Sequence, residues 1–221
     1  VLKNLLESLF SLTSYKNFEV VLVDNGSTEE GLKTYYSEIC SQHPVRVIEY
    51  NEPFNYSRAN NLGASAARSD LLLFMNNDMQ IIDPEWLTEL CQWAMVPQIG
   101  IVGAKLLHQD NSIQHAGVIL GLQGFVGHLY LNTPEHFFGL TGSVDWYRDY
   151  YAVTGACQMM RKDVYDELNG YDEDFKLVFS DIDLCLRAIE KNFRVLYTPH
   201  AVLKHLEGKS RGYSSPNSDI L

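Results

Sequence analysis

Two aspartates open a predicted helix in the stretch FSDIDLCLR, residues 179–187. Ser180 and Asp183 have the spacing of a helix cap and its capping-box partner, which explains both without a function. Asp181 is left over, in the first turn, where the helix dipole favours its ionised form and apolar neighbours raise a carboxyl pKa. An ionised carboxylate in a partly dry site suits a general base, so Asp181 is a candidate base, with a structural role as the alternative.

Two polar clusters have residue types that bind metal ions or phosphates. Asp78 ends the triplet NND after an apolar run, and its carboxylate suits Mg²⁺ or Mn²⁺. His205 is a candidate second ligand, although a single histidine is more often a hydrogen-bonded structural residue. Lys209 and Arg211, in GKSRG, have the charges to clamp a diphosphate, with a solvated tail as the alternative. Turns are rich in Asn and Asp for backbone reasons, so NND also has a structural explanation.

The order of elements predicts how such residues meet. Apolar runs of β-forming residues predict strands at 18–24, 45–50, 71–75, 99–107 and 193–199. Helical spacing predicts helices between them, among others at 57–67, 83–95 and 181–192. This alternation predicts an α/β fold with a mostly parallel sheet flanked by helices, in which ligands lie beyond the carboxyl ends of the strands. After residue 110, a glycine-rich and aromatic sequence predicts short antiparallel strands.

The composition limits the classes of protein. A chain of 221 residues with 46% hydrophobic and 20% charged residues suits one globular domain. A formal net charge of −11 argues against a nucleic-acid partner and against strong attraction to anionic lipid. No apolar run is long enough for a membrane span, and no secretory signal is visible. The four cysteines form no CxxC pair, so we expect reduced core residues in a cytoplasmic protein.

These motifs occur together, and their order resembles that of the family 2 glycosyltransferases, which use nucleotide-sugar donors on a GT-A fold. The order is VVLVDNGST, NNLG, LLLFMNND, TGAC, NGYDEDF, SDIDLCLR and HLEGKSRG, spanning roughly residues 2–212. The likeness is greatest to bacterial members that assemble cell-surface polysaccharides, such as rhamnosyltransferases. It implies an inverting transfer of a hexosyl or deoxyhexosyl group to a hydroxyl of a glycan or lipid-linked glycan, with Mn²⁺ or Mg²⁺ as cofactor.

The resemblance also implies roles for single residues. Asp181 matches the base that acts on the acceptor hydroxyl, and Asp78 and His205 match the metal ligands. Donor-binding positions are implied for Asp24, Asn61, Gly63, Asn77, Thr154, Gly155, Lys209 and Arg211.

Within the single domain, residues 1–110 are expected to bind the nucleotide sugar. Residues 111–212 are expected to hold the acceptor and the base, and 213–221 to form a tail. The full-length protein is expected in the cytoplasm, associated peripherally with the inner face of the membrane.

The sequence departs from the family pattern at three places. Asn76 stands where the acidic motif usually begins with Asp, and Ser180 stands where an acidic residue often precedes the base. The first strand of the fold is expected before Val1, so part of the nucleoside pocket would be missing from this chain, which is then inactive alone. An inactive sugar-nucleotide-binding module of a larger protein therefore remains the alternative. A dinucleotide oxidoreductase is disfavoured, because no G-x-G-x-x-G follows a visible strand.

Overall fold

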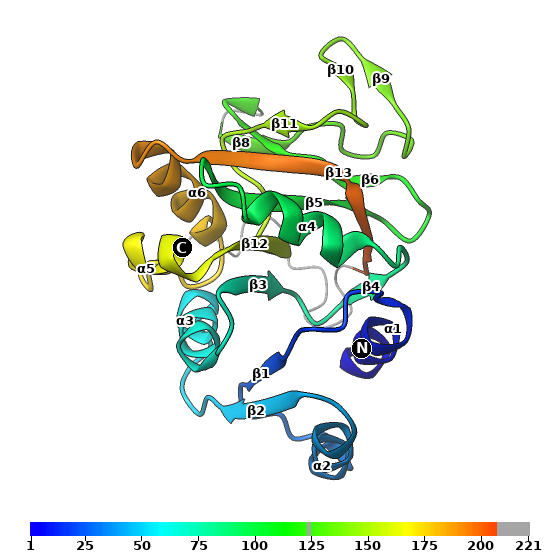
Figure 1. Ribbon diagram of the computed structural model, residues 1–221, viewed down its shortest axis with the longest axis vertical. Coiled ribbons are helices and arrows are strands. Elements are labelled where there is room, and N and C mark those ends of the chain that lie inside the picture. The colour runs from blue at the N-terminus through cyan, green and yellow to red at the C-terminus, as the bar shows by residue number, and fades with distance from the viewer. Residues whose placement is uncertain (123–124, 207–221) are drawn as a thin grey trace.

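The computed structural model describes residues 1–122 and 125–206. Lys209, Arg211 and the expected tail at 213–221 lie outside the described residues, so the roles expected of them stay predictions. Helices and strands alternate through the first half of the chain, and short strands dominate its middle (Figure 1). This order confirms the α/β class that the sequence predicts.

A seven-stranded sheet forms the centre of the molecule (Figure 1). In order across the sheet, its strands are β11 (Arg148–Asp149), β13 (Arg194–His205), β5 (Ile99–Leu107), β12 (Cys157–Arg161) and β3 (Leu71–Met75), with β4 (Met79–Ile81) on β13 and β6 (Ile113–His115) on β5. β13 runs parallel to β5, whereas β12 is antiparallel to both β5 and β3. β3, β5 and β13 therefore share one direction.

Two further strands form a separate parallel pair. They are β1 (Val20–Asp24) and β2 (Val45–Glu49), connected by α2 (Leu32–Gln42). α3 (Tyr56–Ala66) packs against β1 and leads the chain to β3 (Figure 1). The carboxyl ends of β1 and β3 thus lead into the DNGST and NND segments of the family motifs.

A cavity of about 660 Å³ separates β1 from β3. Both strands line it, and α1 (Leu2–Leu12) adds an apolar wall formed by Leu2, Leu5, Leu6 and Leu9. Because β1 and β3 belong to different sheets, one more strand between them would join the two sheets. We associate this cavity with the strand expected before Val1, which stays a prediction.

Three more helices complete the fold. α4 (Trp86–Ala94) and α6 (Ser180–Glu190) both pack against β5 and β13, and α5 (Lys162–Glu167) packs against β12. Among the described residues, no helix combines the length and the apolar character that a membrane span requires.

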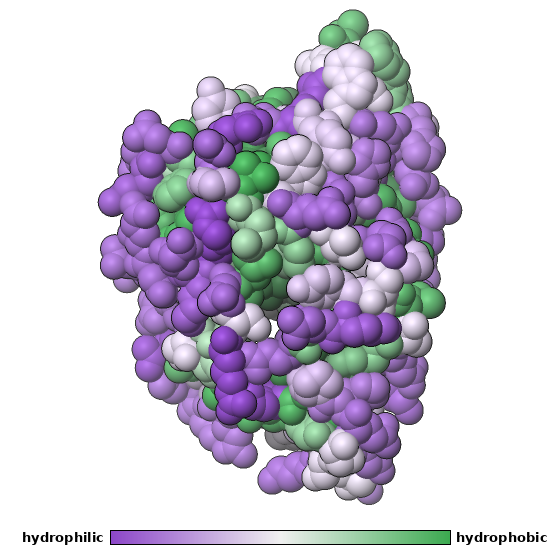
Figure 2. All heavy atoms as spheres, viewed as in Figure 1, coloured by the Kyte–Doolittle hydropathy of each residue, from purple (hydrophilic) through white to green (hydrophobic). Residues whose placement is uncertain are grey.

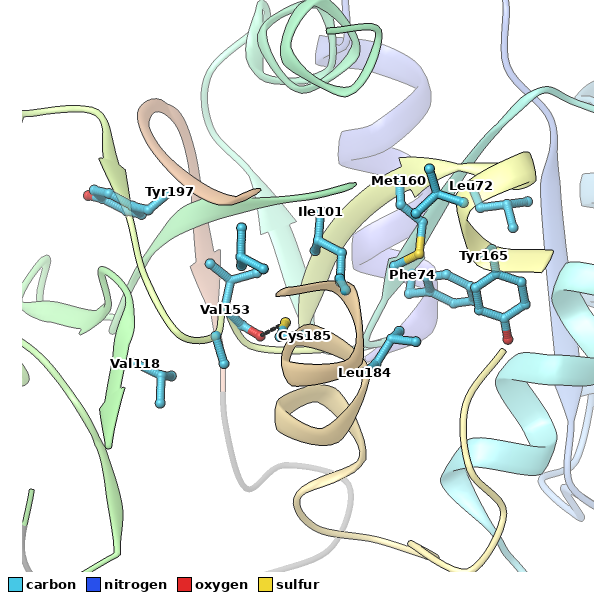
Figure 3. Packing of buried hydrophobic residues seen from close by; sticks show 14 of the residues in the cluster. Leu72, Phe74, Ile101, Val118, Val153, Met160, Tyr165, Leu184, Cys185 and Tyr197 are labelled. Atoms are coloured by element: carbon cyan, nitrogen blue, oxygen red, sulfur yellow. Dashed lines mark hydrogen bonds between the residues drawn. The ribbon is translucent and has the colours of Figure 1, made fainter. Parts of the chain in front are cut away.

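The core under α6 fixes the place of its first turn. Leu184 and Cys185 are fully buried, and Figure 3 shows both among the side chains of this core. The Sγ of Cys185 donates to the carbonyl oxygen of Val153 over 3.8 Å. Burying one leucine side chain contributes about 1.5–3 kcal/mol. The first turn, with Asp181, is thereby held beside the segment that follows Val153.

Short antiparallel strands occupy the middle of the chain, as the sequence predicts. β7 (Val118–Leu120) pairs with β8 (Val126–His128), and β9 (Phe138–Gly139) pairs with β10 (Gly142–Ser143). The β9–β10 hairpin protrudes from the body of the molecule (Figure 1). Its exposed Phe138 and Leu140 form an apolar tip, visible in green in Figure 2.

The predicted cap of the helix at Ser180 is wrong. α6 begins at Ser180 itself, and its N-cap is Phe179, which has no polar side chain and a left-handed backbone with φ 66°. Asp183 instead forms an ion pair with Arg187 one turn later, with 2.7 Å between Oδ2 and Nη2. The positive φ of Phe179 turns the chain directly into the helix, so no side-chain cap is formed.

The expectation of four core cysteines is wrong for Cys40, which is exposed, whereas the other three are buried or half-buried. Cys40 lies on α2, which packs against β2 of the small two-stranded sheet. One side of α2 therefore faces solvent. All four thiols are free, as expected.

Candidate active site

The turn that follows β3 meets the end of β13. The strand predicted at 193–199 continues to His205, because a register shift lets β13 follow β5 further. His205 pairs with Met79 of β4, which brings its ring beside Asp78. The Oδ1 of Asp78 lies 3.0 Å from the Nε2 of His205, and each residue is only 8% exposed. Two predicted metal ligands, 127 positions apart in the chain, are therefore in contact.

The donor set of this pair fits a divalent cation. The Nδ1 of His205 lies 2.8 Å from the Oε1 of Gln114; because Oε1 only accepts, Nδ1 carries a proton. The Nε2 of His205 then faces the carboxylate of Asp78. Two lone pairs at this distance repel one another unless a proton or a metal ion lies between them. Within residues 1–122 and 125–206, no cluster of three His, Cys, Asp or Glu could hold a metal ion alone.

Asp181 is held by backbone amides on both carboxylate oxygens. The N–H of Gly155 donates to Oδ2 over 2.7 Å, and the N–H of Ile182 donates to Oδ1 over 2.9 Å. The carbonyl of Gly155 accepts a hydrogen bond from the Tyr56 hydroxyl over 2.9 Å. A Cβ at position 155 would lie 2.7 Å from the hydroxyl oxygen of Tyr56 and 3.2 Å from the Cβ of Asp181. An alanine here would force the Tyr56 hydroxyl to move and would press on the Cβ of Asp181.

Burial raises the pKa of the Asp181 carboxyl above its usual value. The amides of Gly155 and Ile182 and the charge of His128 act in the opposite direction and only partly offset burial. The sequence predicts these opposing effects, and the structure shows that desolvation is the larger. A half-buried carboxylate with a raised pKa is a better proton acceptor than an exposed one.

A single segment connects the base candidate with the Asp78–His205 pair. The carbonyl of Ala156, next to Gly155, accepts a hydrogen bond from the N–H of Asn76 over 3.0 Å. The side-chain Nδ2 of Asn76 lies 3.4 Å from the Nε2 of His205. Residues 154–156 and Asn76 thus connect Asp181 with the Asp78–His205 pair through hydrogen bonds, which brings the three predicted residues into one region.

Three predicted donor-binding residues lie at the end of β1 or beside the cavity between β1 and β3. Asp24 ends β1, and its Oδ1 accepts the N–H of Ser27 over 3.2 Å. Gly63 on α3 and exposed Asn77 line the cavity between β1 and β3, but Asp78, Asp181 and His205 do not. This cavity therefore does not include the three residues of the candidate chemistry. The donor-binding roles of Asp24, Gly63 and Asn77 stay predictions.

Asn61 is occupied by the protein itself. Its Nδ2 donates to the carbonyl of Tyr171 and to Oε1 of Glu173, each over 3.0 Å. Its Oδ1 accepts from the hydroxyl of Tyr165 and from the N–H of Tyr171. These four bonds satisfy every donor and acceptor of the amide. Asn61 therefore fixes the loop before α6, and the predicted donor contact remains untested.

Sequence reasoning missed the contact between His115, which is fully buried, and His128, which is half-buried. The Nδ1 atoms of His115 and His128 lie 2.9 Å apart, and their rings meet edge to face with centroids 4.9 Å apart. The spacing of these two histidines in the sequence does not indicate a site. They meet only because the β7–β8 hairpin folds back toward the end of β6. Gln114, beside His115, was also missed, because its partner His205 lies 91 positions away in the chain.

Comparison with solved structures shows the fold. The protein resembles GalNAc-T7, solved with UDP, GalNAc and Mn²⁺, with a TM-score of 0.74 and 16% identity over 92% of this chain and 41% of that one. It also resembles S. aureus TarS 1-349, solved with UDP-GlcNAc, with a TM-score of 0.65 and 16% identity over 99% of this chain and 59% of that one. These likenesses confirm the GT-A-like fold that the motifs predict.

Comparison of sequences identifies the family. The chain is 40% identical over 212 residues to the O-antigen biosynthesis protein RfbC of Myxococcus xanthus, which covers 96% of this chain and 16% of that protein. It is 25% identical over 239 residues to the N-acetylglucosaminyl-diphospho-decaprenol L-rhamnosyltransferase of Mycobacterium tuberculosis H37Rv, covering 96% of this chain and 73% of that enzyme. The family model of Glycosyl transferase family 2 matches residues 1–168, and the chain belongs to that family.

Proposed function

We propose that this glycosyltransferase domain is an inverting, metal-dependent enzyme that uses a nucleoside-diphosphate-sugar donor. The observation that carries the proposal is the chain of hydrogen bonds that connects Asp181 with the Asp78–His205 pair through residues 154–156 and Asn76. A base and a cation site connected in this way would serve the two ends of one displacement: the hydroxyl that attacks and the diphosphate that leaves.

Asp78 and His205 would hold the cation, Mn²⁺ or Mg²⁺. Their carboxylate and imidazole suit either ion, and the hydrogen bond from His205 to Gln114 orients the ring for ligation. A bound divalent cation stabilises the negative charge that a departing diphosphate gains. The solved structure of GalNAc-T7 contains Mn²⁺ together with UDP, which supports such a requirement here.

Asp181 would act as the base in a single displacement. The acceptor oxygen bonds to the anomeric carbon while its proton passes to the Asp181 carboxylate. The bond from that carbon to the diphosphate oxygen breaks at the same time, and its electron pair leaves with the diphosphate. One displacement inverts the anomeric centre without a covalent intermediate, so no second carboxylate is needed. Gly155 holds Asp181 in place through its amide, and with Thr154 it would lie beneath the donor sugar.

The names of the relatives support a role in cell-surface polysaccharide synthesis. One relative acts in O-antigen biosynthesis, and another is a rhamnosyltransferase on a diphospho-decaprenol carrier. We infer a glycan or lipid-linked glycan acceptor, and a place for the full-length protein at the cytoplasmic face of the membrane. The exposed side chains of Phe138 and Leu140 on the β9–β10 hairpin suit contact with the lipid of such an acceptor (Figure 2).

A thermal-shift screen tests this function. The full-length protein is heated with Mn²⁺ and a panel of uridine, guanosine and thymidine diphosphate sugars, and release of the nucleoside diphosphate is measured for each. We expect one donor to raise the melting temperature only when Mn²⁺ is present, and to be turned over. Binding of a donor without any turnover would instead identify the inactive module, and absence of binding across the panel would refute the proposal.

A further inference from the structure

Two consecutive residues of β6 contact the two halves of the candidate active site. The Oε1 of Gln114 lies 2.8 Å from the Nδ1 of His205, on the side of the proposed metal ion. The Nε2 of His115 accepts the backbone N–H of Thr154 over 3.3 Å, on the side of Asp181. Successive side chains of a strand point to opposite faces. One short strand therefore reaches both the candidate metal ligand and the segment that holds the candidate base.

His115 is a hydrogen-bond acceptor built into the core. It is fully buried, and its Nε2 accepts a second backbone amide, the N–H of Gly117, also over 3.3 Å. A ring nitrogen that accepts hydrogen bonds carries no proton. Burial lowers the pKa of His115 well below its usual value, so the ring is neutral near neutral pH. The Nε2 of His115 is therefore a fixed acceptor for the two amides.

The amide that His115 accepts is next in the chain to the amide that holds the candidate base. The N–H of Thr154 donates to His115, and the following N–H, that of Gly155, donates to the Oδ2 of Asp181 over 2.7 Å. Each peptide group is planar, and only two soft dihedral angles separate one plane from the next. Fixing the direction of the Thr154 amide thereby restricts the direction of the Gly155 amide.

We propose that His115 is a positioning residue for the base, which holds Thr154 so that the N–H of Gly155 is aimed at the carboxylate of Asp181. The inference rests on the proposed function, in which Asp181 takes the proton of the acceptor hydroxyl. Gln114 has the corresponding task on the metal side, through its contact with the ring of His205. Replacing His115 is then expected to change the base, whereas replacing Gln114 changes the metal site.

The consequence for Asp181 has a definite sign. Burial raises the pKa of the Asp181 carboxyl, and the hydrogen bond from the N–H of Gly155 partly offsets this rise. His115→Phe keeps a ring but removes the acceptor, so the amide of Thr154 loses its partner and the bond from Gly155 weakens. The pKa of Asp181 should therefore rise further. His115→Gln keeps an acceptor oxygen at the place of Nε2 and should restore most of the wild-type behaviour.

Titratable groups on the surrounding elements also act on Asp181. They are His128 on β8, Tyr171 in the loop before α6 and Cys185 on α6 itself. Burial raises the pKa of both the Tyr171 hydroxyl and the Cys185 thiol, so these two groups stay neutral while Asp181 titrates. A positive charge on His128 lowers the pKa of Asp181. A rise in His115→Phe therefore cannot come from a charge gained by His128.

The titration of Asp181 is measured first, without any substrate. The full-length protein is labelled with ¹³C at its aspartate carboxyl groups, Asp181→Asn assigns the resonance, and its chemical shift is followed with pH. We expect a higher pKa of Asp181 in His115→Phe and nearly the wild-type pKa in His115→Gln and Gln114→Ala. Calorimetry with Mn²⁺ and a nucleoside diphosphate should show the reverse: weaker binding in Gln114→Ala and unchanged binding in His115→Phe. An unchanged pKa of Asp181 in His115→Phe would overturn the proposal.

The matched control is Thr198→Val, which removes another fully buried side-chain hydrogen bond. The hydroxyl of Thr198, on β13, donates to Oε1 of Glu89, on α4, over 2.6 Å. This variant should lower the melting temperature but leave the pKa of Asp181 unchanged. An equal rise of that pKa in Thr198→Val and His115→Phe would assign the effect to lost stability and overturn the positioning role.

The wild-type protein supplies a second test, which decides the matter if His115→Phe does not fold. Long-range ¹H–¹⁵N correlations of the ¹⁵N-labelled protein report which ring nitrogen of His115 carries the proton, and hydrogen exchange reports the protection of the Thr154 amide. We expect an unprotonated Nε2 near neutral pH and slow exchange at Thr154. A proton on Nε2, or exchange at Thr154 as fast as in an open loop, would overturn the proposal.

Kinetics test the consequence for transfer. Acceptors are p-nitrophenyl glycosides, and the donor is the one that the thermal-shift screen identifies. We expect His115→Phe to lower kcat about tenfold, the effect of one lost hydrogen bond, and to move the acidic limb of the pH–rate profile to higher pH, with little change in the acceptor KM. An acidic limb at the wild-type pH would overturn the positioning role in transfer. If no donor is turned over at all, the proposed function fails, while the titration of Asp181 still decides whether His115 positions it.

Discussion

At the scale of single residues, the proposed role of Asp181 as base predicts how the reaction depends on pH. Its ionised form would accept the proton, and burial raises its pKa. Transfer is therefore expected to be fast at pH values above this raised pKa, and its rate should fall as the pH drops through that pKa. Asp181→Asn should lower the transfer rate by about 10²–10⁴-fold, the usual contribution of a general base. A pH–rate profile of both proteins measures this.

The control for Asp181→Asn is Asp174→Asn, at an exposed aspartate in the loop before α6. This variant should keep the wild-type rate and profile. If Asp181→Asn retains the acidic limb of the profile at an undiminished rate, another group is the base.

Gly155 gives a second test at this scale. A methyl group there would meet the hydroxyl of Tyr56 and the Cβ of Asp181, which shifts the carboxylate. A displacement of about 1 Å costs on the order of 10²-fold in rate; a Cβ 3.2 Å from that of Asp181 forces a smaller shift, so Gly155→Ala should lose part of the rate, less than about 100-fold. The double variant Gly155→Ala with Tyr56→Phe removes one of the two clashes and should recover part of the rate. A double variant no faster than Gly155→Ala would show that the clash is not the cause.

Gln114 gives a third test, on the metal. Its Oε1 accepts the Nδ1–H of His205 and fixes the ring that faces Asp78. Loss of such an orienting partner usually costs about 10–100-fold in metal affinity. We therefore expect Gln114→Ala to weaken Mn²⁺ binding by that factor in calorimetry with a nucleoside diphosphate. Gln109→Ala, at an exposed residue, should bind Mn²⁺ as the wild type does; unchanged affinity in Gln114→Ala would refute the orienting role.

At the scale of elements, the cavity between β1 and β3 makes a prediction about the strand expected before Val1. Leu2, Leu5, Leu6 and Leu9 of α1 line that cavity. A strand that precedes α1 and runs parallel to β1 would have α1 as its crossover helix, the common right-handed arrangement. In a longer protein that includes this strand, the amides of β1 and β3 should exchange with solvent more slowly than in the chain of 221 residues. Equal hydrogen exchange in the two proteins would place that strand elsewhere.

The elements also show what the sequence can and cannot predict. Apolar runs predicted β1, β3 and β5 because strands covered on both faces have few polar positions. Asp78 was found because it follows a predicted strand, and Asp181 was found because it opens a predicted helix. The His115–His128 pair was not found, because it depends on how a short hairpin folds back. The four bonds of Asn61 were missed for a similar reason, since its partners lie 104 to 112 positions away.

At the scale of the whole molecule, the net charge and the course of β13 both favour a cation at the donor site. The chain has a formal net charge of −11, so a diphosphate approaches against repulsion unless a cation screens it. β13 connects this global property to the local site, because its last residue is His205, in contact with Asp78. The proposed cation therefore serves both donor binding and departure of the leaving group.

The most direct measurement is anomalous diffraction from crystals of the full-length protein soaked with Mn²⁺ and a nucleoside diphosphate. We predict one manganese peak at about 2.1 Å from the Oδ1 of Asp78 and the Nε2 of His205, an ordinary ligand distance. The diphosphate should contact the ion, with Asp181 facing the same space. A nucleotide bound in this region while manganese lies away from both residues, or is absent, would contradict the account.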